Sequence, residues 1–384
     1  MRTRFFCAVF LSLCLSAPAQ TTPAQTAKHT PSPEANKDAP WPTGELTERQ
    51  MGDAIEQRVK NAVARNEFSG VFAAFRADSD LYQHAFGVAD EKGTPIRPNT
   101  RFMLGSLSEV VTSVAIAQLV QAGKLRYEDT LAKVLPSYPD HANASLITVQ
   151  ELLTHTSGLP DYRTAADSRK KSLALREPAD YFPLIAGRPL NSAPGKAFHR
   201  SNSDNALAAA IIEVVSGQHY ADYLRDHIFR AAHMKDTALA GADEKVPSLA
   251  TGFTRKTGEG PVALRPRTPT HPPIDLLDGL YSTGLDVFRF ARALRTNVFL
   301  NPELTEKITT GVVETPDGSK YGYGFFVEGA GPERVLLQRG EAPGINTELE
   351  MMWDGSATVV ILSNYDPPAP AELGSRVMDF LRMQ

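Results

Sequence analysis

A serine and a glutamate three residues apart are the first candidates for chemistry in this chain. Apolar residues recur every three or four positions after Ser106, which predicts a helix from Ser106 to Gly123. A serine in the first turn of a helix lies near free backbone N–H groups and the positive end of the helix dipole, which suits a nucleophile whose product is an anion. Such a nucleophile needs a base, and Glu109 lies on the same helix face.

The residues from Ser106 to Glu109 also have the pattern of an ordinary helix start. Their spacing is that of a capping box, in which the serine and glutamate side chains satisfy each other's backbone N–H groups. We favour this structural interpretation of Ser106 over a nucleophile, because a carboxylate beside the serine would oppose a developing oxyanion. The sequence leaves both interpretations open.

The elements around this helix predict an α/β fold built from both ends of the chain. Alternating apolar residues with turns between them predict strands, and a period of three to four residues predicts helices. The predicted elements are strands at 68–76, 81–88, 324–327, 335–337, 347–352 and 357–363, and helices at 45–65, 147–153, 204–216, 286–296 and 371–382. We therefore expect an α/β part from residues 46–124 and 280–384, with a mostly helical insertion at 125–279.

The start of the chain predicts export. Arg2 and Arg4 precede an apolar run from Phe5 to Leu15 and a small-residue cleavage site, which is the pattern of a signal peptide over residues 1–19. Residues 20–45 are rich in Pro, Thr, Ala and Lys and lack apolar periodicity, which predicts a disordered linker. We therefore expect the mature protein in the periplasm or outside the cell.

Composition excludes several other classes of protein. Cys7 and Cys14 both lie in the expected signal peptide, so the mature chain would have no disulfide, thiol nucleophile or cysteine-bound metal. A lipid anchor on Cys14 is the less favoured alternative. The formal net charge of −4 predicts no surface for nucleic acid, and the nine histidines show no metal-ligand spacing. We expect no transmembrane span, no metal and no cofactor, and the oligomeric state stays open.

Five short boxes, in this order along the chain, resemble those of the serine β-lactamase-related family. That family includes class C β-lactamases, D-alanyl-D-alanine carboxypeptidases and related esterases. The boxes are Phe102-Met103-Leu104-Gly105-Ser106, residues 151–159, Ser201-Asn202 ahead of 211–217, Gly279-Leu280-Tyr281-Ser282-Thr283 and Ala342-Pro343-Gly344. The resemblance implies a β-lactamase/transpeptidase-like fold over 46–384, an antiparallel sheet flanked by terminal helices with a helical insertion, and the serine at the junction of the two parts.

The catalytic boxes of that family are altered in this chain. The family has Ser-x-x-Lys, then Tyr-x-Asn, then a late Lys or His-x-Gly. The matching segments here are Ser106-Leu107-Ser108-Glu109, Arg200-Ser201-Asn202 and Gln338-Arg339-Gly340. The serine, the asparagine and the glycine are kept, and the lysine, the tyrosine and the histidine are replaced.

Each replacement removes a group that could move a proton. Lysine can share a proton with serine, whereas Glu109 brings a negative charge to the same position. Arginine does not give up its proton in a protein, so Arg200 cannot act as the base that tyrosine would be. Gln338 can donate a hydrogen bond to a substrate carboxylate but does not titrate. The new charges are opposite in sign, so we predict a salt bridge between Glu109 and Arg200.

Other motifs have ordinary interpretations. Ser203-Asp204-Asn205 and Lys256-Thr257-Gly258 spell two boxes of class A β-lactamases, but their places in the chain indicate coincidence. We assign His155 a structural hydrogen-bonding role. Asn202 could contact a ligand or stabilise a turn. Arg339 and Glu341 are expected at the rim of a cleft, as binding groups or as solvated charges.

These observations predict a degenerate hydrolase. Our leading hypothesis is an exported protein that keeps the fold but binds a peptide, a cell-wall fragment or a partner, with Asn202, Gln338 and Gly340 as ligand-binding residues. The alternative is an active esterase, peptidase or β-lactamase that uses Ser106 with Glu109, or a water held by Asn202, as its base. A third hypothesis is a structural partner of an active paralogue.

Overall fold

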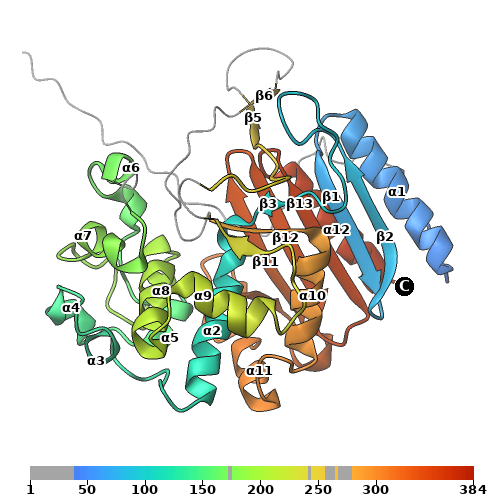
Figure 1. Cartoon of the computed structure of the whole chain (residues 1–384). Helices are drawn as coiled ribbons and strands as arrows, with labels where there is room; N and C mark the ends of the chain where they lie inside the picture. The colour runs from blue at the N-terminus through green and yellow to red at the C-terminus, as the bar shows by residue number, and fades with distance from the viewer. Residues whose placement is uncertain (1–38, 172–174, 241–243, 256–263, 267–278) are drawn as a thin grey trace, which may run out of the picture.

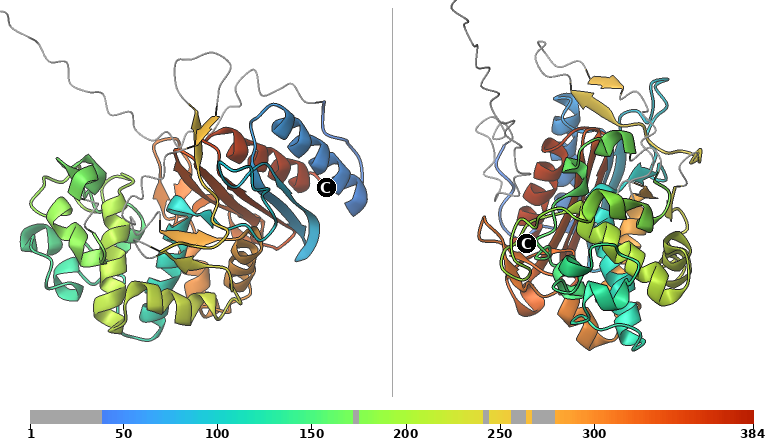
Figure 2. Two further views of the ribbon diagram at one scale, coloured as in Figure 1. Left: turned by 45° about the horizontal axis from the view of Figure 1, so that its top comes forward. Right: turned by 90° about the vertical axis from the view of Figure 1, so that its left-hand side faces the viewer.

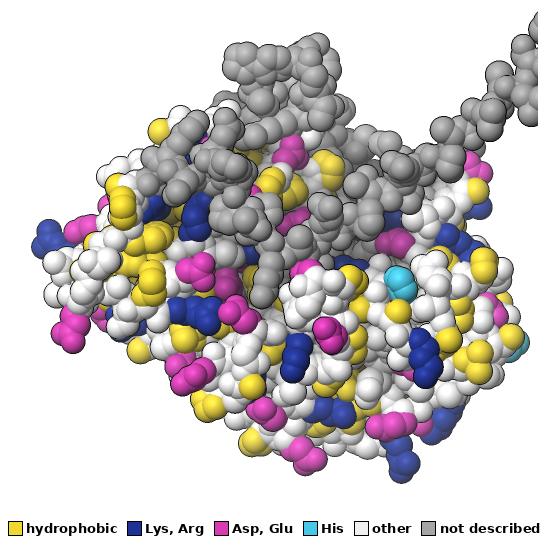
Figure 3. Space-filling model, turned by 180° about the vertical axis from the view of Figure 1, so that it is seen from behind, with side chains coloured by type: hydrophobic (Ala, Val, Ile, Leu, Met, Phe, Trp, Pro, Cys, Tyr) yellow, Lys and Arg dark blue, Asp and Glu magenta, His cyan; other side chains and the backbone are white. Residues whose placement is uncertain are grey.

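The computed structural model describes residues 39–171, 175–240, 244–255, 264–266 and 279–384. The signal peptide expected at 1–19 and the Lys256-Thr257-Gly258 motif lie outside these residues. No helix in the described part of the chain is both long enough and apolar enough to cross a membrane. Basic and acidic side chains are scattered among one another on the face shown in Figure 3.

Both ends of the chain contribute to one antiparallel sheet of eight strands (Figure 1). The strand order is β2-β1-β13-β12-β11-β10-β9-β8, and β1 pairs along its whole length with β13. The strands are β1 (Gly70–Arg76), β2 (Ser79–Phe86), β8 (Val313–Glu314), β9 (Lys320–Tyr321), β10 (Phe326–Glu328), β11 (Val335–Ala342), β12 (Ile345–Met352) and β13 (Ala357–Ser363). This sheet confirms the predicted α/β fold.

Strand β1, which is second from one edge of the sheet, is buried on both faces, and its alternate side chains point to opposite sides. Val71, Ala73 and Phe75 belong to the core shared with the helical part of the molecule. Phe72 and Ala74 belong to a second core, under the two terminal helices. The sheet is therefore the middle layer between two apolar cores.

Helices α1 (Glu48–Ala64) and α12 (Ala369–Arg382) cover one face of the sheet (Figure 1). The side chain of Thr47 begins α1 in a capping box with Gln50. Trp41, in the segment expected to be a disordered linker, instead stacks on Phe380 of α12 with ring centroids 4.3 Å apart. The prediction of a disordered linker is therefore wrong at Trp41, because the indole ring packs against an aromatic ring of α12.

The remaining helices lie on the other side, where Figure 2 shows the helical segments gathered away from α1 and α12. Helix α2 (Glu109–Gln121) packs against α8 (Asn202–Ser216), and α10 (Gly284–Arg295) packs on β1 and β13. The other helical elements are α3 (Leu131–Val134), α4 (His141–Ala144), α5 (Val149–Leu153), η3 (Tyr162–Thr164), α6 (Ser168–Lys171), η5 (Pro178–Tyr181), α7 (Phe182–Ile185), α9 (Tyr220–Leu224), η6 (Arg225–Phe229), α11 (Pro302–Ile308) and η7 (Gly331–Glu333).

A short sheet leads the chain into α2. Its strands are β3 (Phe102–Met103), β7 (Leu280–Ser282) and β4 (Ala238–Leu239), and a separate pair joins β5 (Phe253–Arg255) to β6 (Leu264–Pro266). After β3 the chain forms the 3₁₀ turn η2 (Gly105–Ser108) before α2 begins at Glu109. The helix that we predict from Ser106 is therefore present, but its first turn is 3₁₀. We call η2 the serine turn.

Candidate functional site

The serine turn lies against strand β11. The hydroxyl of Thr347 donates to the carbonyl of Leu104 at 2.7 Å, which joins the turn to the sheet. A Cβ on Gly340 would lie 1.9 Å from that same carbonyl oxygen, so only glycine allows β11 to approach this closely. Gly340, which we predict to bind a ligand, thus has a structural reason to be glycine.

Ser106 does not cap the helix. Neither η2 nor α2 has a side-chain hydrogen bond at its N-cap, so the predicted capping box is wrong. The side chain of Glu109 turns to tertiary partners, which offer stronger interactions than the local backbone. Among the described residues, the partly exposed Ser106 hydroxyl has no hydrogen-bonding partner.

Glu109 is held by four donors at a single oxygen, Oε2. Arg200 Nη2 and Gln338 Nε2 each lie 2.9 Å from it, the Tyr321 hydroxyl 3.2 Å and His155 Nε2 3.5 Å. The predicted salt bridge between Glu109 and Arg200 is confirmed. It joins the start of α2 to the residue two before α8, across the place where the family has its lysine and tyrosine.

The partners of Glu109 keep it ionised. Burial alone would raise the pKa of Glu109, but the positive charge of Arg200 and the hydrogen bond of His155 outweigh burial and lower this pKa to about 2. Burial and the negative charge of Glu109 hold the pKa of Tyr321 well above its usual value. The tyrosine in this site is therefore a hydrogen-bond donor and not a base.

His155 connects Glu109 to a second buried carboxylate. Its Nδ1 lies 2.8 Å from Oδ2 of Asp204, and the hydroxyl of Ser157 donates to Oδ1 of Asp204 at 2.5 Å. Burial would lower the pKa of His155, but hydrogen bonds to Asp204 and Glu109 outweigh burial and raise it to about 9. Burial raises the pKa of Asp204 to about 6 despite these bonds.

Arg200, Glu109, His155 and Asp204 therefore form a row of alternating charges at neutral pH, which we call the charge row. Its two cations balance its two anions. Glu109, His155 and Asp204 are each no more than 5% exposed. A buried set of charges is tolerated only when each charge is compensated and hydrogen-bonded, as here. The structural role that we assign to His155 is consistent with this row.

Two residues of this region were not recognised from the sequence. Asp204 lies in the Ser203-Asp204-Asn205 motif, which we interpreted as a coincidence. Its side chain is buried in the first turn of α8, and a buried carboxylate needs hydrogen-bonding partners. Tyr321 lies on the two-residue strand β9, which gives no pattern that could place it near Glu109.

The remaining predicted site residues have protein partners. The backbone N–H and the side-chain amide of Asn202 both donate to Oδ2 of Asp161. Gln338 is fully buried, and its Oε1 accepts from the N–H of Arg339. Direct contacts of Asn202 and Gln338 with a ligand stay predictions.

We expected Arg339 at the rim of a cleft, and this prediction is wrong. Its guanidinium pairs with the buried carboxylate of Glu348 at 2.6 Å and donates to Ser375 of α12. Side chains alternate along β11, so Arg339 points to the face opposite Gln338 and Gly340. It fixes α12 on the sheet.

A sheet made from both chain ends, a helical part beside it and a serine turn between them define the fold of the serine β-lactamases and penicillin-binding proteins. The chain belongs to the Beta-lactamase family, whose family model matches residues 55–381.

Relatives and solved structures agree with this membership. Penicillin-binding protein 4* of Bacillus subtilis is 29% identical over 315 residues, which are 78% of this chain and 69% of the relative. The putative penicillin-binding protein PbpX of the same organism is 27% identical over 90% of this chain and 83% of its own. A penicillin-binding protein from Bacillus halodurans has a similar structure, with a TM-score of 0.75 and 25% identity, covering 85% of this chain and 98% of that one. A D-amino acid amidase from Ochrobactrum anthropi shares the fold with a TM-score of 0.73 and 22% identity, over 86% of this chain and 99% of that one.

Proposed function

We propose that this protein is a pseudo-hydrolase, a member of the Beta-lactamase family that binds a ligand at its serine turn without cleaving it. The observation that carries this proposal is the fourfold engagement of Glu109 at the position of the family's lysine. A nucleophilic serine requires a neighbouring group that can take its proton. In this chain the residue at that position is committed to donors from the rest of the site.

None of the ionisable groups that contact Glu109, nor Glu109 itself, is suited to be that base. A general base works best when its pKa lies near the working pH, and the pKa of Glu109 is about 2. The pKa of Tyr321 is raised, so its phenol stays protonated. His155 is protonated and lies between two carboxylates. These properties support a binding role over the alternative of a hydrolase with Glu109 as its base.

The ligand that we propose is a peptide or cell-wall fragment with a free carboxylate. About a quarter of the Arg200 side chain is exposed (25%), and the guanidinium uses one nitrogen for Glu109. Its other N–H groups can donate to a ligand carboxylate. The names of the two Bacillus subtilis relatives refer to penicillin, which also carries a carboxylate. A folded protein partner is the alternative ligand.

The test of the chemistry uses the whole chain and its Ser106→Ala variant. We expect no covalent labelling by a fluorescent penicillin or a fluorophosphonate, and no turnover of a chromogenic cephalosporin or a short acyl ester above that of the variant. An active penicillin-binding protein serves as the positive control. Labelling that depends on Ser106 would overturn the proposal.

The test of binding uses a short peptide that ends in D-alanyl-D-alanine. We expect saturable binding by calorimetry without release of the terminal residue. Arg200→Gln should weaken binding by about tenfold, which corresponds to the loss of one charge-assisted contact of about 1.4 kcal/mol. Arg225→Gln, at an exposed ion pair on η6, is the control and should leave binding unchanged. Absence of binding in the wild type would contradict the peptide as ligand.

We also propose that the protein is exported. The support is the basic start, the apolar run from Phe5 to Leu15 and the small residues before residue 20. Mass spectrometry of the protein from the native envelope should find a mature chain that begins after Ala19. A chain that keeps its first residues and stays in the cytoplasm would contradict this proposal.

A further inference from the structure

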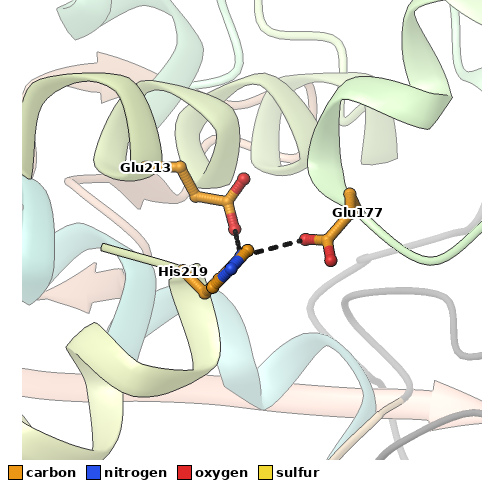
Figure 4. Close-up of side chains that lie close together, drawn as sticks. All are labelled: Glu177, Glu213 and His219. Carbon is orange, nitrogen blue, oxygen red and sulfur yellow. Dashed lines mark ion pairs between the residues drawn. The ribbon is translucent and has the colours of Figure 1, made fainter. Parts of the chain in front are cut away.

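Three side chains with metal-ligand atoms converge among the helices of the molecule, and none of them belongs to the charge row (Figure 4). They are Glu177, before η5, Glu213 of α8 and His219, at the N-cap of α9. One ligand atom from each lies within 4.8 Å of the other two. Among the described residues, no other group of three or more His, Asp, Glu or Cys side chains has its ligand atoms this close together.

The distances suit a transition-metal ion. His219 Nδ1 lies 3.6 Å from Oε2 of Glu177 and 3.8 Å from Oε1 of Glu213. Around a tetrahedral zinc ion with bonds of about 2.1 Å, neighbouring ligand atoms are about 3.4 Å apart. Small rotations of these side chains would therefore bring them to the spacing that an ion requires.

The backbone around the three residues is fixed before any ion binds. Oε1 of Glu213 accepts the N–H of Tyr220 at 2.7 Å, which holds the carboxylate at the start of α9 next to His219. The carboxylate of Asp180 accepts the N–H of Glu177 at 3.0 Å, which fixes the chain at the start of η5. Three separate elements thus present one ligand each.

The site is open to solvent beside His219 and Glu177. His219 is 73% exposed and Glu177 is 51% exposed, so water can complete the coordination of an ion. One imidazole and two carboxylates are a ligand set that zinc accepts, whereas calcium and magnesium prefer oxygen alone.

We propose that Glu177, Glu213 and His219 bind one divalent transition-metal ion, of the zinc type, that ties η5 to the turn between α8 and α9. The ion would stabilise the packing of these helical elements and would take no part in reactions at Ser106. The proposal therefore does not depend on whether Ser106 is a nucleophile.

The test is calorimetric titration of zinc chloride alone into the chelator-treated whole chain. We expect one ion per chain, and a melting temperature that rises with zinc concentration because the ion binds only the folded state. His219→Ala and Glu177→Gln should each weaken the affinity by at least about tenfold, without changing the far-ultraviolet circular dichroism. His141→Ala, an exposed histidine on α4, is the matched control and should bind as the wild type does.

Cobalt gives a second readout. Bound at this site, it should show the absorption of a four- or five-coordinate ion, and zinc should displace it. Absence of saturable binding in the wild type would overturn the proposal. Binding that survives both His219→Ala and Glu177→Gln would overturn it as well, because the ion would then lie elsewhere.

Discussion

Arg200 and Glu109, which lie 91 positions apart in the chain, are joined by a hydrogen bond of 2.9 Å between Nη2 and Oε2. The Glu109 side chain is 5% exposed and that of Arg200 is 25% exposed, so the pair is largely shielded from water. Removing one partner of a buried pair leaves the other charge uncompensated. We therefore expect the pair to stabilise the fold whether or not a ligand is bound, so that loss of one partner alone is costly.

Substitution of Arg200 tests that statement. Arg200→Ala should lower the free energy of unfolding by about 3–5 kcal/mol, because Glu109 would remain ionised and buried with weaker partners. Chemical denaturation monitored by circular dichroism measures the change. The control is Arg225→Ala, whose ion pairs with Asp222 and Asp226 are on the surface and should contribute little. Equal effects of the two substitutions would contradict the structural role of the pair.

The free energy of unfolding should depend on pH through the protonation of His155. Its pKa is raised to about 9 in the folded protein, from about 6.5 in an unfolded chain. The stability that comes from protonated His155 is therefore complete below about pH 6.5 and is lost as the pH rises through about 9. Between about pH 7 and 9.5, the wild type should lose about 2–3 kcal/mol to this group.

Two variants isolate that contribution. His155→Gln should be less stable than the wild type at neutral pH and should have a flatter profile of unfolding free energy above about pH 7. His227→Gln, on the surface of η6, should keep the wild-type profile. An unchanged slope in His155→Gln would show that the imidazole is neutral in the folded protein, contrary to our assignment.

The sequence alone was sufficient to predict features that depend on a local residue pattern or on the sign of a charge. The helix predicted at 204–216 is α8, and its expected stop, Gly217, adopts the left-handed conformation with φ of 73°. The pairing of Glu109 with Arg200 was predicted because a family contact had been replaced by two opposite charges. Neither prediction required knowledge of the packing.

The sequence was insufficient where tertiary contacts override a local rule. The capping box fails because the Glu109 carboxylate finds Arg200, Gln338 and Tyr321, which come from elements far along the chain. Nothing near Tyr321 indicates that β9 lies beside α2. The position of Arg339 could have been inferred from strand alternation, since Gln338 and Arg339 are neighbours and cannot face the same side.

Gly340 offers a test of the contact between β11 and the serine turn. Gly340→Ala places a Cβ 1.9 Å from the Leu104 carbonyl and 2.5 Å from the Thr347 hydroxyl, so the turn must move. We expect a loss of about 2–4 kcal/mol in the free energy of unfolding. Gly93→Ala, where a Cβ meets open space, should lose only about 1 kcal/mol from backbone strain. Similar losses for the two variants would contradict the close contact.

Restoring the family's residues should restore reactivity at Ser106. Glu109→Lys alone would place an ammonium group beside the cations Arg200 and His155, so this variant should be destabilised and remain unreactive. Glu109→Lys combined with Arg200→Tyr supplies an amine and a phenol that can exchange protons and removes one competing cation.

We expect the double variant to label with a fluorophosphonate at least about tenfold faster than the wild type, since a positioned base typically contributes more than this. Adding Ser106→Ala should abolish the labelling, which identifies the reacting hydroxyl. Circular dichroism and a cooperative melt show whether each variant is folded before rates are compared. A folded double variant that labels no faster than the wild type would mean that the loss of reactivity does not arise from the Glu109 and Arg200 replacements.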